Sequence, residues 1–279
     1  MGAYACFLRT YDNTRYWFKD YNYYFVASYP YSTDPAKGFQ IQRDTYGVDF
    51  MYALDVDAYN EDARTDNGVD ILTAYNSVNT SGPSEEWLKP VQLNLSHLLT
   101  KVNLKISQDT RPELGDPLNN YYIKEVSING LATDAQYLLV PQEDGTITGA
   151  WLTDNTTNPY VKTFEIDYEK PLKEGEVSVW GDNTEGGLLL IPQSIAPNTV
   201  QIKIDYVYEL YIEDTEDTTV TPEREERTFE VYIPASDLLK SNSVITYKLS
   251  FSKASKITFL APEIEQWGTP QTGGTIIIQ

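Results

Sequence analysis

Residues 200–212 read Val200-Gln201-Ile202-Lys203-Ile204-Asp205-Tyr206-Val207-Tyr208-Glu209-Leu210-Tyr211-Ile212, and this stretch decides the fold class. Apolar or aromatic side chains occupy every second position from Val200 to Ile212. Because successive side chains of a strand point to opposite faces of its sheet, this period of two predicts a long, half-buried β-strand. The solvent face of that strand is expected to carry Gln201, Lys203, Asp205 and Glu209.

The same alternation recurs along the chain and predicts further strands. They are expected at residues 91–95, 102–106, 122–128, 228–233, 245–251 and 257–261. Clusters of Gly, Pro, Asn and Asp separate these stretches and mark turns. The acidic residues 213–227 are expected to form a hairpin loop, and helical signals are limited to single turns at 96–101 and 234–240. We therefore predict an all-β sandwich fold with few short helices.

The composition favours the same fold class and excludes some partners. The chain holds 22 tyrosines in 279 residues, and tyrosine suits a pleated, half-buried surface. Its formal net charge of −20 repels the phosphates of nucleic acids and an anionic membrane surface. We expect no nucleic-acid partner.

Residue types that could carry catalysis or bind a metal are scarce. His97 is the only histidine, and no Gly-x-Ser-x-Gly element accompanies it, so we expect a structural imidazole and no enzymatic activity. Cys6 is the only cysteine, which excludes an intrachain disulfide and, with a single histidine, a zinc site of N and S ligands. Residues 55–66 fail as a calcium loop because Asn60 stands where the sixth-position glycine is needed. We predict no cofactor and no metal.

Two features are candidates for binding. The chain ends in an apolar segment that follows Gly273-Gly274 and contains Thr275, Ile276, Ile277 and Ile278. This segment is either a final edge strand of its own sandwich or a donor strand that completes the sheet of another subunit. Aromatic side chains that could stack on sugar rings are Trp151, Tyr160 and Trp180.

The sequence carries fewer signals for the domain boundary and the cellular compartment than for the fold class. No stretch approaches the roughly 20 apolar residues of a membrane span, and no signal peptide is recognisable. We expect either a cytosolic protein or the mature form of an exported one. A boundary is expected at residues 81–84 or 108–117; placed at 108, it gives an N-terminal sandwich of residues 1–108 and a C-terminal sandwich of residues 109–279.

Five short motifs, in order, carry a family resemblance. They are Tyr23-Tyr24-Phe25-Val26-Ala27-Ser28-Tyr29-Pro30-Tyr31, Asp49-Phe50-Met51-Tyr52-Ala53, the stretch 91–102 around His97, Leu188-Leu189-Leu190-Ile191-Pro192-Gln193, and Ile264-Glu265-Gln266-Trp267-Gly268. Together they resemble the fimbrillin family of Bacteroidetes, the Mfa-like pilins of the type V pilus. The stretch 91–102 departs from the family pattern, because Leu95 stands where phenylalanine is common and a serine precedes His97.

The resemblance implies two tandem transthyretin-like Greek-key β-sandwich domains and a pilus subunit or adhesin, not an enzyme. It implies a fimbrium outside the cell, a lipoprotein precursor exported to the outer membrane, and a membrane contact only through a lipid anchor on a precursor segment. In that family proteolysis removes an N-terminal strand, so residues 3–8 are expected to lie beyond it. Other pilin subunits would bind by donor-strand exchange, and a host or bacterial surface glycan or protein would be the adhesion ligand. The alternative is a cell-surface carbohydrate-binding module.

Overall fold

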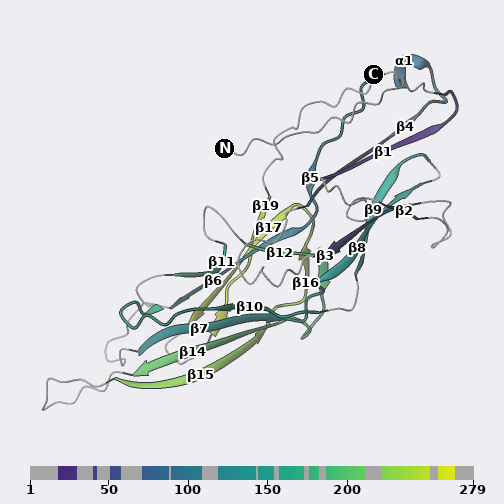
Figure 1. Cartoon of the computed structure of the whole chain (residues 1–279). Coiled ribbons are helices and arrows are strands. Elements are labelled where there is room, and N and C mark those ends of the chain that lie inside the picture. Colours follow the sequence, from purple (N-terminus) through teal and green to yellow (C-terminus); the bar gives the residue numbers. More distant parts are fainter. Residues whose placement is uncertain are drawn as a thin grey trace, which may run out of the picture.

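Two pairs of β-sheets lie end to end along an elongated molecule (Figure 1). The structure is a computed structural model that describes residues 18–29, 40–42, 51–57, 71–87, 89–108, 119–142, 144–153, 157–172, 176–181, 187–210, 222–251 and 257–267. The predicted all-β class is confirmed, and the single described helix is the short α1 (Ser84–Trp87).

The N-terminal end of the molecule is built from two sheets. One has the order β1-β4-β5 and contains β1 (Asn22–Tyr29), β4 (Leu72–Asn79) and β5 (Ser96–His97). The other has the order β2-β3-β8-β9 and contains β2 (Gln40–Gln42), β3 (Met51–Asp57), β8 (Asp134–Pro141) and β9 (Ile147–Thr153). The buried apolar residues at this end form the N-terminal cluster, which consists of Leu54, Leu98, Leu99, Ala135, Tyr137, Leu139, Ile147, Leu189 and Ile191.

The other end is a larger sandwich. Its first sheet has the order β10-β7-β14-β15, from β7 (Asn119–Asn129), β10 (Tyr160–Thr163), β14 (Gln201–Leu210) and β15 (Glu223–Tyr232). In its second sheet β6 (Thr100–Gln108) runs parallel to β17 (Ser243–Phe251), and the flanking strands are β11 (Val177–Trp180), β12 (Leu188–Leu190), β18 (Ile257–Phe259) and β19 (Glu263–Gln266). A two-stranded sheet pairs β13 (Gln193–Ile195) with β16 (Ser236–Leu239).

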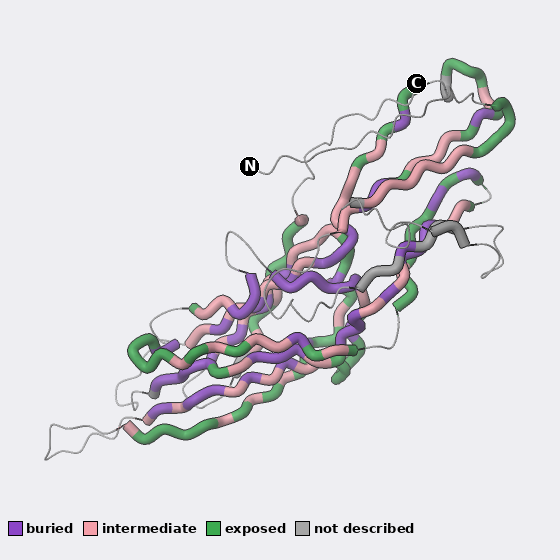
Figure 2. The backbone as a smooth tube through the Cα atoms, viewed as in Figure 1, coloured by how far each residue is buried: buried purple, intermediate pink, exposed green. Residues whose placement is uncertain are grey.

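The C-terminal cluster fills the larger sandwich and follows the predicted period of two. Ile202, Ile204 and Tyr206 of β14 are buried in it, next to alternating residues of β6, β7 and β17. Figure 2 shows this alternation along β14, beside a largely exposed β15. The decisive stretch of sequence therefore forms the strand that the pattern predicts.

The apolar run at β12 is explained by its position between the two clusters. Leu188 and Leu190 belong to the C-terminal cluster, whereas Leu189 and Ile191 belong to the N-terminal cluster. Because a strand alternates its side chains between two faces, a segment that is covered on both faces is apolar at every position. This short segment therefore joins the two cores.

Strand pairing crosses the position at which the domain boundary was placed. Strand β6, before residue 109, pairs with β17, and β8, after it, pairs with β3. The chain thus passes from one end of the molecule to the other at residues 98–99, returns at residues 130–133, and crosses a third time between β9 and β10. Domains of residues 1–108 and 109–279, and a transthyretin-like Greek-key topology, stay predictions.

Several local predictions differ from the structure. Residues 91–95 form no strand, although Val91 is buried, and the helical turns expected at 96–101 and 234–240 are replaced by strands β5, β6 and β16. Residues 223–227, expected in a loop, open β15. Pairing with other strands overrides local propensity at 96–101, 223–227 and 234–240.

Candidate assembly surfaces

Apolar side chains that are only partly buried flank both clusters. Five pack against the N-terminal cluster: Tyr24, Val26, Ile71, Trp151 and Trp267. Seven pack against the C-terminal cluster: Phe164, Val177, Tyr208, Phe229, Val231, Leu238 and Phe259. Apolar surface that a further strand could cover is therefore present at both ends.

His97 stacks on Trp267 beside the N-terminal cluster. Their ring centroids lie 4.1 Å apart and the rings are 4° from parallel. His97 belongs to β5 and pairs with Leu72 of β4, while the backbone N–H of Trp267 donates a hydrogen bond to the carbonyl of Asn242 at 3.0 Å. The stack therefore joins the N-terminal sheet to the residue at which the C-terminal segment begins, and it gives His97 the structural role that was predicted.

Gln193 holds the point where the chain crosses between the sandwiches. Its Oε1 accepts a hydrogen bond from the Ala132 N–H at 2.9 Å, and its Nε2 donates to the Ala132 carbonyl at 3.2 Å. Close by, Thr133 is fully buried and its hydroxyl accepts a bond from Asn158 Nδ2 at 3.0 Å. The motif of residues 188–193 thus ends in a side chain that fixes the backbone between β7 and β8.

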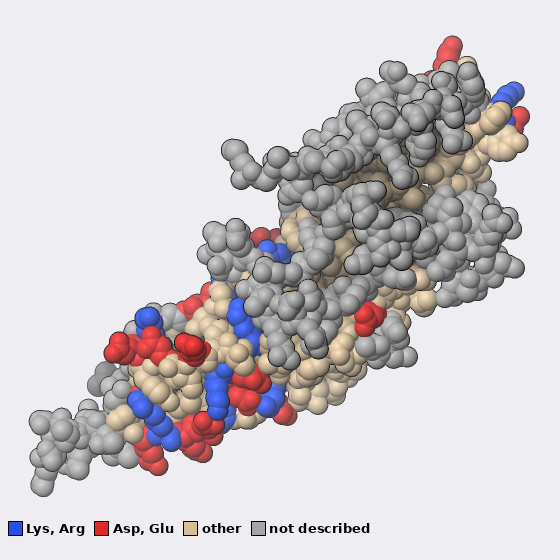
Figure 3. Space-filling model, in the orientation of Figure 1, with Lys and Arg blue, Asp and Glu red and all other residues tan. Residues whose placement is uncertain are grey.

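The outer strands of the larger sandwich are charged. Strand β15 begins with five consecutive charged residues from Glu223 to Arg227, and β19 carries Glu263 and Glu265, both exposed. Lysine, arginine and carboxylate side chains are interspersed over this end of the molecule (Figure 3). Among them Lys124 pairs with Glu226 at 2.9 Å. Charged side chains on edge strands oppose pairing with other chains.

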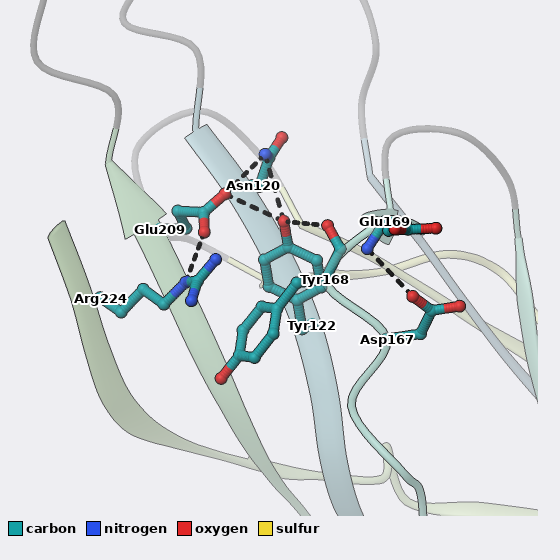
Figure 4. A network of polar contacts seen from close by, with 7 residues as sticks. All are labelled: Asn120, Tyr122, Asp167, Tyr168, Glu169, Glu209 and Arg224. Atoms are coloured by element: carbon teal, nitrogen blue, oxygen red, sulfur yellow. Dashed lines mark hydrogen bonds and ion pairs between the residues drawn. The ribbon is translucent and has the colours of Figure 1, made fainter. Parts of the chain in front are cut away.

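A buried polar network closes the far end of the larger sandwich (Figure 4). Glu209 is 1% exposed, and its carboxylate accepts bonds from Asn120 Nδ2 at 3.0 Å and the Tyr122 hydroxyl at 2.9 Å. Arg224 Nε donates to the other carboxylate oxygen at 2.6 Å, which raises the pKa of Arg224. The Arg224 guanidinium also lies 3.7 Å from the centre of the Tyr168 ring. The prediction that Glu209 faces solvent is wrong, because this network covers it.

The other titrating groups with clear pKa shifts are structural. Burial alone would raise the pKa of Asp205, but the bonds from Lys203 and Thr228 outweigh it and hold this pKa below its usual value. Burial raises the pKa of Tyr247 to about 12. Asp205 accepts its hydrogen bonds from Thr228 and Lys203 of the same sheet, and the Ser236 side chain offsets part of the rise in the Tyr247 pKa. No cluster of three or more His, Cys, Asp or Glu in the described ranges could hold a metal ion. The described helix is also too short to cross a membrane.

Two of the three predicted binding aromatics are buried in the C-terminal cluster, and the third lies on β9. Trp180 and Tyr160 are 1% and 3% exposed and belong to the C-terminal cluster, where their rings offer no face to an external ligand. Trp151 is half-buried on β9, packs against Tyr137, and places Nε1 3.5 Å from the Ser241 hydroxyl. The predicted donor residues Thr275, Ile276, Ile277 and Ile278 lie outside the described residues.

Sequence reasoning missed Gln193 and Trp267 as contact residues, although both stand in motifs that carry the family resemblance. It also missed the outer strand β9. The available signal was a seven-residue stretch, Ile147–Thr153, that has no charged side chain in a strongly acidic chain.

Comparison with solved structures shows a shared fold. A fimbrial protein from Bacteroides vulgatus superposes with a TM-score of 0.54 and 18% identity, over 87% of this chain and 77% of its own. A proposed cell adhesion protein from Bacteroides uniformis is 16% identical over 88% of this chain and 73% of its own, with a TM-score of 0.38. No curated protein sequence matches significantly.

Comparison with protein-family models gives a match over nearly the whole chain. The family is described as fimbrillin-like, and its model covers residues 3–267. The span includes all five motifs, except for the last glycine of the fifth, and both clusters. It is a family of fimbrial structural proteins and not of enzymes. The chain therefore belongs to the fimbrillin-like family.

Proposed function

We propose that this protein is a structural subunit or adhesin of a type V-like pilus at the cell surface, assembled by donor-strand exchange. Membership of the fimbrillin-like family supports the pilus role, and the fold shared with a fimbrial protein is consistent with it. A lipid anchor on a precursor segment would attach the exported subunit to the outer membrane before assembly.

The observation that carries the proposal is the family match over residues 3–267. The acceptor is proposed at the N-terminal cluster because the apolar C-terminal segment follows Trp267, which packs against that cluster. Val26 on β1, Ile71 before β4 and Trp151 on β9 keep part of their apolar surface in contact with solvent. A strand from a neighbouring subunit would cover this surface, gaining backbone hydrogen bonds and apolar burial together. The N-terminal end is therefore the proposed acceptor.

The proposed donor is the apolar C-terminal segment. Thr275, Ile276, Ile277 and Ile278 carry no charge, so they avoid repulsion from a subunit whose net charge is −20. In an extended segment Ile276 and Ile278 share one face, and full burial of each would contribute about 1.5–3 kcal/mol. The segment follows Trp267, which is itself at the rim of the N-terminal cluster.

Removal of residues 275–279 tests this assignment. The shortened protein is expected to remain folded by circular dichroism but to form no polymers that electron microscopy or size-exclusion chromatography detects. A double substitution, Ile276→Asp with Ile278→Asp, is expected to have the same effect because both charges would enter the acceptor.

The matched control places one charge on the opposite face of the segment. Ile277→Asp is expected to weaken assembly less than either single change at Ile276 or Ile278. Polymers of normal length from the shortened protein would remove the donor assignment while leaving the family and the fold unchanged.

The alternative function, a carbohydrate-binding module, has less support. Of the three aromatic rings considered for stacking on sugars, two are buried and Trp151 is half-buried against Tyr137. Membership of the fimbrillin-like family makes the pilus subunit the better-supported function.

A further inference from the structure

Strand β9 (Ile147–Thr153) is an outer strand whose edge is unprotected. Within the described part of the chain, it pairs with β8 on one side and with no strand on the other. Its seven residues carry no charge, and Thr148, Gly149, Ala150, Leu152 and Thr153 are exposed. Leu152 keeps 44% of its surface exposed, so a partner strand could bury it further.

The edge of β9 differs from two other outer strands, β15 and β19, because it carries no charge. Strand β15 is also outermost in its sheet, but its first five residues are charged, and β19 carries two glutamates among four residues. Natural proteins use such charges to prevent unwanted strand pairing. A long, neutral edge without them is suited to pairing with another strand.

The hydrogen-bond pattern shows which backbone groups of β9 point outward. The Gln142 N–H donates to the Thr146 carbonyl at 2.8 Å, so hydrogen-bonded pairs with β8 recur at every second residue. The pairs Val140–Thr148 and Leu138–Ala150 follow in this alternation. The N–H and C=O groups that point away from β8 therefore belong to Ile147, Gly149, Trp151 and Thr153.

We propose that the outer edge of β9 pairs antiparallel with β9 of a second copy of this chain, about a two-fold axis at Ala150. The four residues with outward backbone groups are distributed symmetrically around Ala150, as a self-complementary interface requires. In this register Gly149 and Trp151 of opposite copies exchange two backbone bonds, and so do Ile147 and Thr153.

Side-chain chemistry favours a second copy as the occupant. The two Ala150 residues meet at the axis, where small side chains allow the backbones to approach. The exposed Leu152 of each copy lies opposite Thr148 of the other and is covered by it. Each copy carries a net charge of −20, and β9 is a neutral place at which such copies can meet. The pairing is independent of residues 275–279.

A cysteine at the axis tests the register directly. At a non-hydrogen-bonded pair the two Cα atoms lie about 4.5 Å apart, within the range of about 4.4–6.8 Å that a disulfide spans. In a Cys6→Ser background, Ala150→Cys is expected to give a covalent dimer under mild oxidation. The matched control is Glu265→Cys on the exposed outer strand β19, which is expected to stay monomeric on the same gel.

Opposite charges at Ala150 test whether β9 of one copy pairs with β9 of the other. Ala150→Lys alone, or Ala150→Glu alone, places like charges opposite each other and is expected to weaken dimerisation at least about tenfold in sedimentation equilibrium. An equimolar mixture of the two variants is expected to restore the dimer. Salt is expected to strengthen the wild-type dimer, because it screens the repulsion between two acidic molecules.

Three outcomes would overturn the proposal: a wild-type protein that stays monomeric at high concentration and high salt, single variants that dimerise as the wild type does, or a dimer that is lost when residues 275–279 are removed. The last result would assign the edge to a C-terminal strand instead. A dimer that persists in the shortened protein while polymers are lost would support both this pairing and the donor strand, as separate interfaces.

Discussion

At the scale of single residues, Glu209 is the side chain on which the far end of the larger sandwich depends. Its carboxylate satisfies two buried donors, Asn120 and Tyr122, and also Arg224. Arg224 in turn covers the ring of Tyr168, which places the turn at residues 167–170 on the sheet. One buried acid therefore fixes three strands and a connecting segment.

We predict that Glu209→Ala lowers the free energy of unfolding by about 2 kcal/mol. Removal of the carboxylate leaves buried donors without an acceptor, which is the costly part of a lost hydrogen bond. The loss stays below the range for a fully buried ion pair because the Arg224 side chain is 42% exposed. Urea denaturation followed by circular dichroism measures it.

The control for this prediction is an exposed ion pair on the same sheet. Glu226→Ala breaks the pair with Lys124, in which both side chains are well exposed, and is expected to cost less than about 1 kcal/mol. Equal losses in the two variants would show that the Glu209 network contributes no more than a surface pair.

At the scale of elements, the alternating pattern predicted those strands that have one buried face and one more exposed face. The stretches 102–106, 122–128, 201–210 and 245–251 lie in central strands, whose alternation reflects one buried face. The pattern failed where an element has two buried faces or none. The leucines of β12 show no alternation because both faces are covered, and β15 continues through charged residues because its edge is exposed.

The candidate surfaces were less predictable than the strands. His97 and Trp267 stand 170 positions apart, and only the fold shows that their rings stack. Likewise, the burial of Trp180 and Tyr160 depends on the sheets that cover them, which no local pattern of aromatic residues encodes. A composition rich in tyrosine indicates sheets, but not which rings face solvent.

The connection between β7 and β8 depends on Gln193. We predict that Gln193→Ala lowers the free energy of unfolding by about 1–2 kcal/mol, because the Ala132 N–H and C=O both lose a partner at a position that is mostly shielded from water. Gln201→Ala, at an exposed amide bonded to Glu230, is the matched control and is expected to cost less than about 0.5 kcal/mol. Thermal unfolding of the two variants side by side checks the difference, and equal midpoints would contradict the role given to Gln193.

At the scale of the whole molecule, the two sandwiches share structure and not only a linker. Strand β6 pairs with β17 directly after the chain leaves β5, and β8 returns to the N-terminal sheet from β7. Between the ends, β12 contributes neighbouring leucines to different clusters. Loss of packing on one face of β12 should therefore be transmitted to the other.

This sharing leads us to predict one cooperative unfolding transition for the described fold. Leu189→Ala removes packing from the N-terminal cluster and Leu190→Ala from the C-terminal cluster, and each is expected to cost about 2–4 kcal/mol. Because both residues belong to the same short strand, both variants should lower the midpoint of the same calorimetric transition. Leu260→Ala, at a leucine that is 43% exposed, should leave it nearly unchanged. Two resolved transitions, one moved only by Leu189→Ala and the other only by Leu190→Ala, would show that the sandwiches unfold independently despite the strand between them.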